Sequence, residues 1–232
     1  MLSFDLSYQW LDFKARYHAE IEPGVTCILG PSGGGKSTLL SLLGGYIRGE
    51  GELLFSGGDF NALLPYERPI STLFQSDNLF PQLNVWHNVA IGIAPSRNLS
   101  EQQRIRVEQA VEQVQLTEHQ TKFPSQLSGG QAQRVAVARV LARKQPILLL
   151  DEPFSALDPR LRDEMLQLIA ELTLANHWTT IMVTHSPQDA LMLGGKVLLI
   201  ESGEILAQND AKVLRDTPSN SPFSRYLGHR AK

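Results

Sequence analysis

Gly30-Pro31-Ser32-Gly33-Gly34-Gly35-Lys36-Ser37 is the stretch of sequence that decides the fold. It fits the pattern G-x-x-x-x-G-K-[ST], in which glycines let the backbone fold round an anion with its N–H groups pointing inward. Lys36 supplies a positive charge to the β- and γ-phosphates of a nucleotide, and the Ser37 hydroxyl ligates Mg²⁺. An apolar run at residues 25–29 precedes the loop, and leucines at helical spacing follow Thr38. This strand–loop–helix order predicts that residues 30–38 bind the phosphates of ATP at a helix N-terminus.

A second buried strand is predicted at residues 147–150, and it ends in two adjacent carboxylates. Asp151 is predicted to hold Mg²⁺ through water, at the C-terminal end of the strand beside the phosphate loop. Glu152 follows directly and is predicted to polarise the attacking water as general base. With the phosphate loop, this pair indicates an enzyme that hydrolyses a nucleoside triphosphate.

The order of the expected elements indicates an α/β fold with a P-loop NTPase core, that is, a mostly parallel sheet with helices on both faces. Residues 1–22 alternate with a period of two, which predicts an N-terminal antiparallel β subdomain. Residues 77–130 are polar and mostly helical, and we interpret them as an inserted helical subdomain. We expect residues 1–232 to form one domain without a C-terminal regulatory domain, and we expect a loosely held tail from Pro218.

Composition narrows the class of protein. The chain has 232 residues, is 42% hydrophobic and 19% charged, and carries a net charge of -3, so nucleic acid is not expected as a partner. Cys27 is the only cysteine and lies in an apolar run, which predicts a core residue and excludes a disulfide within the chain. The N-terminus has no signal-peptide pattern, and no apolar run approaches the roughly 18 residues that a membrane helix needs.

Leu127-Ser128-Gly129-Gly130-Gln131 resembles the signature motif of the ABC ATPase family, and the resemblance extends over nearly the whole chain. The motif opens a helix expected at residues 131–144, which makes a second helix N-terminus suited to an anion. In this family the signature of one subunit closes over the ATP of the other. The resemblance therefore implies a head-to-tail homodimer in which residues 128–131 of each chain contact the partner's ATP.

Other positions match the same family residue by residue. Gln75 lies where a glutamine contacts Mg²⁺ or water and ties the core to the helical insert. Asp158 resembles the D-loop aspartate that reaches across the dimer, and it is also a good helix N-cap, so both roles remain open. His185 resembles the switch histidine that senses the γ-phosphate. Tyr8 falls where an aromatic ring stacks on adenine, and Trp10 is the alternative.

Residues 80–90 resemble a segment of bacterial importer ATPases that enters the insert and docks the membrane subunit. The sequence as a whole looks most like the ATP-binding subunits of thiamine importers. That resemblance implies a peripheral subunit on the cytoplasmic face of the bacterial inner membrane, with a permease and, through it, a periplasmic binding protein as partners. The alternatives are a soluble ABC ATPase of DNA repair or translation and the ATPase subunit of an exporter. After His185, Ser186 and Asp189 depart from the family's usual Asp-x-x-Glu, although Ser186 preserves the helix start as N-cap.

Overall fold

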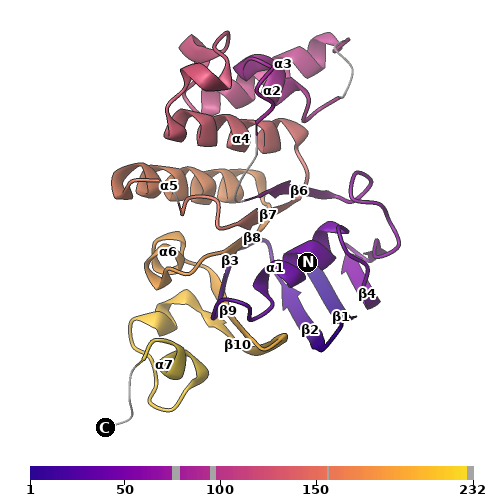
Figure 1. The fold of residues 1–232 in the computed structure, drawn as a ribbon, viewed down its shortest axis with the longest axis vertical. Coiled ribbons are helices and arrows are strands. Elements are labelled where there is room, and N and C mark those ends of the chain that lie inside the picture. The colour runs from indigo at the N-terminus through magenta and orange to yellow at the C-terminus, as the bar shows by residue number, and fades with distance from the viewer. Residues whose placement is uncertain (75–78, 95–97, 156, 229–232) are drawn as a thin grey trace.

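The computed structural model describes residues 1–74, 79–94, 98–155 and 157–228. In this part of the chain the strands form one sheet in the order β5-β4-β1-β2-β10-β9-β3-β8-β7-β6 (Figure 1). The strands are β1 (Leu2–Trp10), β2 (Phe13–Ile21), β3 (Gly24–Leu29), β4 (Glu50–Phe55), β5 (Gly58–Asp59), β6 (Ile70–Leu73), β7 (Ile147–Asp151), β8 (Thr179–Val183), β9 (Lys196–Glu201) and β10 (Glu204–Asp210). The helices are α1 (Lys36–Gly44), α2 (Val85–Ala90), α3 (Glu101–Gln113), α4 (Gly129–Arg143), α5 (Pro159–Asn176), α6 (Pro187–Leu193) and α7 (Pro222–Tyr226).

The parallel half of the sheet separates two hydrophobic cores. β3 pairs in parallel with β8 and β9, and β7 pairs in parallel with β8 and β6. Along β3, Cys27 and Leu29 pack with α4, α5 and α6, whereas Ile28 packs with α1 and the first two strands. Both faces of these strands are therefore buried, as the continuous apolar runs predict. The α/β fold with helices on both faces is confirmed, and Cys27 is a core residue.

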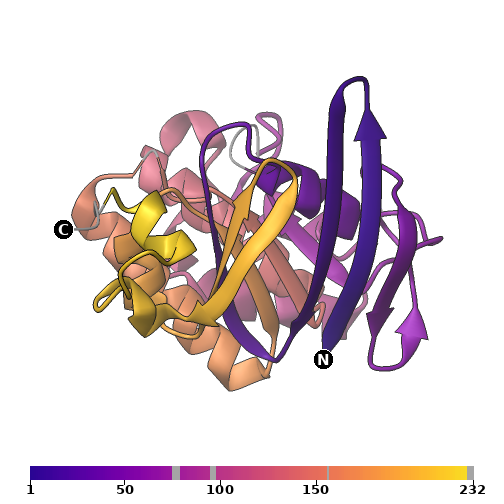
Figure 2. The same ribbon diagram turned by 90° about the horizontal axis from the view of Figure 1, so that it is seen from below.

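The N-terminal strands are antiparallel, as the alternation predicts. β1 pairs with β2 and with β4 in antiparallel register, and the β1–β2 hairpin projects at the top of Figure 2. These strands continue the same sheet, because β2 meets β10 through the parallel pair Arg16–Glu204. The hairpin is thereby held next to the phosphate loop, on the side where α1 packs.

Helices α2, α3 and α4 pack together at the top of Figure 1. α3 begins with the predicted capping box of Ser100 and Gln103. α4 begins at Gly129, two residues before the predicted start, because Ser128 is its N-cap. The limits of the helical insert stay a prediction, since α4 continues to Arg143 in contact with α2 and α3. No helix among the described residues is both long enough and apolar enough to span a lipid bilayer.

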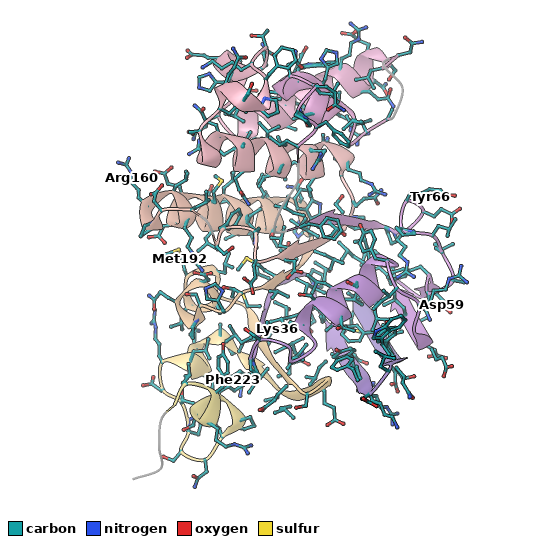
Figure 3. The ribbon with its side chains drawn as sticks, viewed as in Figure 1. Lys36, Asp59, Tyr66, Arg160, Met192 and Phe223 are labelled. Atoms are coloured by element: carbon teal, nitrogen blue, oxygen red, sulfur yellow. The ribbon has the colours of Figure 1, made fainter. Side chains whose placement is uncertain are left out.

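Two parts of the structure differ from the sequence-based expectations. β6 was not expected, although its four residues form the edge of the parallel sheet beside β7. The expectation of a loosely held tail from Pro218 is wrong for the residues described, because α7 docks there and buries Phe223, labelled in Figure 3. Ser221 caps that helix by accepting from the Ser224 N–H, so a polar stretch contains a capped helix with one apolar anchor.

Candidate nucleotide site

The phosphate loop connects β3 to α1, and its shape requires glycine. Gly35 is the N-cap of α1 with φ 103°, and Gly30 has φ 149°. Both values lie in the region that favours glycine. A Cβ at Gly30 would overlap the carbonyl oxygen of Ile200, and one at Gly35 would overlap the Tyr17 hydroxyl. Side chains are therefore excluded at both ends of the loop.

Three segments that are distant in sequence hold this loop from outside. The buried Tyr17 of β2 donates a hydrogen bond to the Gly35 carbonyl at 2.8 Å, and burial raises the pKa of Tyr17 to about 12. In the turn between β9 and β10, the Gly203 N–H donates to the Gly34 carbonyl at 2.9 Å. Tyr226 of α7 is hydrogen-bonded to the Gly30 backbone, and burial raises the pKa of this phenol. Hydrogen bonds from β2, from the β9–β10 turn and from α7 therefore fix the backbone of the phosphate loop.

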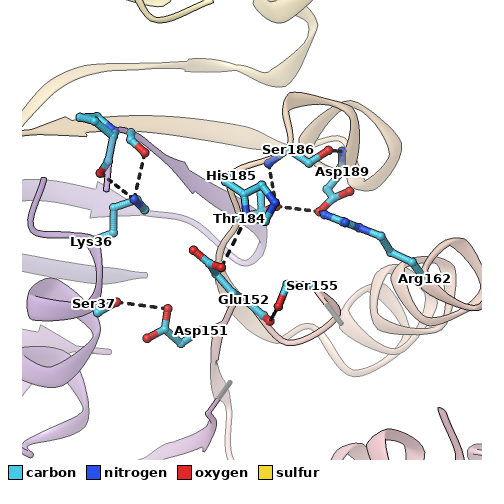
Figure 4. Close-up of polar contacts among 12 residues, drawn as sticks. Lys36, Ser37, Asp151, Glu152, Ser155, Arg162, Thr184, His185, Ser186 and Asp189 are labelled. Carbon is cyan, nitrogen blue, oxygen red and sulfur yellow. Dashed lines mark hydrogen bonds and ion pairs between the residues drawn. The ribbon is translucent and has the colours of Figure 1, made fainter. Parts of the chain in front are cut away.

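Lys36 lies inside the loop and is only 8% exposed. Its Nζ donates to the carbonyl oxygens of Gly30 at 2.9 Å and Pro31 at 2.8 Å (Figure 4). Burial lowers the pKa of Lys36, while the carboxylates of Glu152 and Asp151 raise it. The cation is therefore held by carbonyl dipoles and two nearby acids, at the N-terminal end of a helix that favours an anion.

The two predicted carboxylates stand opposite the loop. The Ser37 hydroxyl donates to Asp151 Oδ1 at 3.4 Å, across 114 residues of sequence. Burial raises the pKa of Asp151, whereas the hydrogen bond from Ser37 opposes the shift. A hydroxyl and a carboxylate are the hard oxygen donors that Mg²⁺ prefers. Among the described residues no three His, Cys, Asp or Glu side chains gather into a metal site.

Glu152 and His185 meet beside these groups. His185 Nδ1 lies 3.4 Å from Glu152 Oε2, and their side chains are 57% and 25% exposed (Figure 4). Glu152 has φ 44°, a left-handed conformation that is costly for a residue with a side chain and typical of functional sites. The strands β3, β7 and β8 are parallel neighbours, so their carboxyl ends bring these residues and Lys36 to one edge.

A cavity of about 360 Å³ lies on the phosphate loop. It is lined by Phe13, Ser32, Gly33, Gly35, Lys36, Ser37, Thr38 and Glu152. Sequence reasoning missed Phe13. Phe13 and Tyr17 are four residues apart in β2, so they lie on the same face of the strand, and Tyr17 touches the loop. Neither Tyr8 nor Trp10 lines this cavity.

The predicted adenine-stacking residues stay predictions. Tyr8 is half-buried and lines a separate cavity of about 430 Å³, which also contains Lys14 and Arg48. Trp10 is 65% exposed near the tip of the hairpin. Gln75 lies outside the described residues.

The signature residues do not line the phosphate cavity of their own chain. Ser128 accepts from the Gln131 N–H at 3.3 Å, and Gln131 Oε1 accepts from the Ser128 N–H at 3.0 Å. Ser128 and Gly129 are exposed, whereas Gly130 is buried so closely against Leu161 of α5 that a Cβ would overlap it. The N-terminus of α4 is therefore preorganised and accessible to another molecule.

Asp158 is the N-cap of α5, as predicted, and accepts from the Leu161 N–H at 3.1 Å. It is exposed, so its side chain also remains accessible to a second subunit. Ser186 likewise caps α6, as predicted. The pattern did not reveal that Asp189, three residues on, is buried in a polar cluster with Thr184 and Arg162. Such a cluster has no signal in sequence, since its arginine comes from another helix.

Comparison with known proteins places this geometry in a family. Residues 17–155 match the family model described as ABC transporter. The chain is 46% identical over 209 residues to the thiamine import ATP-binding protein ThiQ of a Chelativorans species, covering 90% of this chain and 85% of that protein. It is 44% identical to ThiQ of Aliivibrio fischeri, covering 98% of both.

A solved dimeric ATP-binding cassette in a post-hydrolysis state, bound to ADP and Pi, is also similar. It has a TM-score of 0.76 and 30% identity, covering 91% of this chain and 99% of that one. Since the family model matches more than half of the sequence and the relatives match over most of both lengths, the chain belongs to the ABC transporter family.

Proposed function

We propose that this chain is the ATP-binding and ATP-hydrolysing subunit of a membrane importer, and that the imported substrate is thiamine. The observation that carries the hydrolytic part is the meeting of Lys36, Asp151, Glu152 and His185 at one edge of the sheet, beside the glycine loop. Support for thiamine comes from relatives named as thiamine import ATP-binding proteins. In this arrangement thiamine passes through the membrane subunit, and this chain supplies the energy.

The residues of the site divide the chemistry of hydrolysis between them. The loop N–H groups and Lys36 bind the phosphates and balance charge that develops during phosphoryl transfer. Ser37 and Asp151 would hold Mg²⁺, which neutralises phosphate charge when bound. Glu152 takes a proton from the attacking water at a carboxylate oxygen. His185 contacts the γ-phosphate and orients Glu152. Gln75, which precedes the helical insert in the sequence, is predicted to contact Mg²⁺ or the attacking water.

The complete site contains two copies of the chain. Residues 128–131 offer a capped, exposed helix N-terminus, which suits the γ-phosphate of ATP held by a partner. Asp158, also exposed, would reach the same interface. The dimeric cassette with ADP and Pi supports this arrangement. ATP then acts as the bridge that closes a head-to-tail homodimer, and hydrolysis reopens it.

The helical layer is the proposed contact with the permease. A cavity of about 670 Å³ lies between β6 and helices α3 and α4, and its lining includes Tyr66, Arg106, Arg139 and Arg143. Residues 80–90, which resemble the importer docking segment, enter the same layer. The proposal includes a position on the cytoplasmic face of the bacterial inner membrane, with a periplasmic binding protein reached through the permease.

Replacement of Glu152 by Gln tests the hydrolytic role. Glu152→Gln keeps the shape of the site but cannot accept the proton, so we expect ATP turnover to fall by about 10²–10⁴ while ATP still binds. The variant should accumulate as an ATP-bound dimer in size-exclusion chromatography. Glu171→Gln, an exposed carboxylate on α5, is the matched control and should hydrolyse ATP normally. Parental turnover by Glu152→Gln would show that another group is the base.

The transport role needs a separate measurement. Tagged chain purified from gently solubilised membranes should carry a polytopic permease, and vesicles containing that complex should take up labelled thiamine only with ATP inside the cytoplasmic compartment. Uptake should fail with Glu152→Gln. Copurification of ribosomes or DNA instead of a permease would favour a soluble ABC ATPase, and outward transport would favour an exporter.

A further inference from the structure

A buried ion pair lies directly behind the switch histidine. Asp189, in the first turn of α6, is 6% exposed. Its Oδ2 accepts from Arg162 Nη2 of α5 at 2.5 Å and from the Thr184 hydroxyl at 2.7 Å (Figure 4). One carboxylate oxygen therefore joins two helices and the strand end that precedes His185.

The same cluster fixes the backbone on both sides of His185. The Thr184 N–H donates to the Ile28 carbonyl of β3 at 3.1 Å, which anchors the residue before the histidine. The Thr184 hydroxyl accepts from the Ser186 N–H at 3.1 Å, which anchors the residue after it. His185 itself is more than half exposed and touches Glu152. Its ring is thus positioned through its neighbours, and these depend on Asp189.

Arg162 connects this cluster to the surface expected to meet the second subunit. It lies four residues after Asp158, which caps the same helix and is exposed. Its side chain is 20% exposed, and its Nε is buried without a hydrogen bond among the described residues. The contact with Asp189 is then the polar contact that orients the guanidinium, and charge-assisted contacts of this kind are the strong ones.

We propose that Arg162 and Asp189 form a positioning pair that ties His185, and with it Glu152, to the first turn of α5. This inference rests on the proposed function, because it assumes that His185 and Glu152 act in hydrolysis. Neither member of the pair touches the reacting atoms. Any displacement of the start of α5 when a second chain meets Asp158 is carried by the pair to the end of β8. The dimer interface and the hydrolytic groups are thereby linked within one chain.

The test is a cycle of substitutions measured as ATP turnover in the assembled transporter. Asp189→Asn keeps the size of the side chain and an acceptor for Thr184, but it removes the charge that Arg162 binds. We expect kcat to fall about tenfold with KM for ATP within about threefold, since the phosphate loop is untouched. Arg162→Met should give the same loss, and the double variant should lose no more than either single one.

The decisive comparison uses the His185→Ala background. A pair that acts through His185 has nothing left to position there, so adding Asp189→Asn should leave the turnover of His185→Ala unchanged. A purely structural defect would lower turnover by the same factor in both backgrounds, and this result would overturn the proposal. Arg160→Met is the matched control, because Arg160, labelled in Figure 3, lies on the same helix. Arg160 is 90% exposed and pairs only with Glu164 among the described residues.

Two further outcomes separate this inference from the function on which it rests. If His185→Ala lowers turnover but folded Arg162→Met and Asp189→Asn retain parental kcat, the positioning role is wrong and the hydrolytic assignment stands. If His185→Ala itself retains parental turnover, the assigned role of the histidine fails first. Urea unfolding of each variant establishes that it is folded. Should Asp189→Asn not fold, Arg162→Met carries the test, and parental kcat in that folded variant overturns the proposal.

Discussion

Removal of one hydroxyl, in Tyr17→Phe, is expected to loosen the phosphate loop. Tyr17 is fully buried, and its hydroxyl donates to the Gly35 carbonyl at 2.8 Å. Gly35 is the N-cap of α1 and has a left-handed backbone, so its position sets where the helix begins. Phenylalanine keeps the ring and its packing. The variant therefore isolates what the Tyr17 hydroxyl contributes through its hydrogen bonds to the Gly35 carbonyl and the Thr38 side chain.

The expected loss of stability in Tyr17→Phe depends on which hydrogen bonds the Gly35 carbonyl keeps. The Gly35 oxygen also accepts from the Leu39 N–H at 3.0 Å, so it does not lose all its partners. A buried acceptor left wholly unpaired costs about 1–3 kcal/mol, and the retained bond puts the loss in the free energy of unfolding at about 1–2 kcal/mol. In Tyr17→Phe, part of the energy of ATP binding is used to order the loosened loop. An energy of this size raises the dissociation constant for ATP by about tenfold.

Two measurements test this reasoning. Urea unfolding of wild type and Tyr17→Phe gives the change in free energy, and titration with a fluorescent ATP analogue gives the change in affinity. Tyr66→Phe is the control, because Tyr66 is 71% exposed and belongs to another surface. A loss of stability below about 0.5 kcal/mol together with unchanged ATP affinity would refute the claim that the Tyr17 hydroxyl holds the loop.

Two other substitutions test the electrostatics of buried groups. Burial raises the pKa of Asp151, so its charge destabilises the nucleotide-free chain at neutral pH. Asp151→Asn should therefore unfold at a higher urea concentration at that pH. The gain should shrink as pH falls below the raised pKa of the folded chain and vanish below the ordinary pKa of 3.8, where Asp151 is protonated in both folded and unfolded chains. The same variant should lose ATP hydrolysis, and lower stability at pH 7 would contradict the reasoning. The guanidinium of Arg68, a residue that is 2% exposed, donates to the carbonyls of Leu42, Leu43, Asn61 and Leu63. Arg68→Met should therefore lower the free energy of unfolding by about 2–4 kcal/mol in a urea titration. A change below about 1 kcal/mol would mean that water replaces these hydrogen bonds.

The sequence predicted the strands and loops that carry the nucleotide chemistry, because their signals are local. A glycine loop between an apolar run and a leucine-rich helix has few alternative structures, and the short apolar run that ends in Asp151 and Glu152 is typical of a buried parallel strand. The N-caps Asp158 and Ser186 were also predicted, since a cap bonds within three residues of itself.

The supporting residues were not predictable, because their partners are distant in the chain. Arg68 looks like an ordinary surface arginine in a polar segment, yet it is buried under the C-terminus of α1, where four carbonyls and the Phe60 ring surround it. α7 depends on one buried side chain, Phe223, in an otherwise polar stretch. β6 is short and contains Ser71 and Thr72, so it becomes a strand only by pairing with β7.

The difference between predictable motif residues and unpredictable supporting residues has a physical cause that bears on the function. Groups that react with a substrate must be accessible, so they lie at strand ends and helix starts, where short motifs place them. Groups that hold the reactive ones in place must be buried, so they come from whichever segment packs behind: Tyr17 from β2, Gly203 from the β9–β10 turn, and Asp189 with Arg162 from two helices. Glu152 keeps a left-handed backbone that costs free energy, and it can do so only because such contacts fix the residues around it. The precision of the site is therefore a property of the whole sheet, and substitutions behind the motifs should alter hydrolysis while the motifs themselves stay intact.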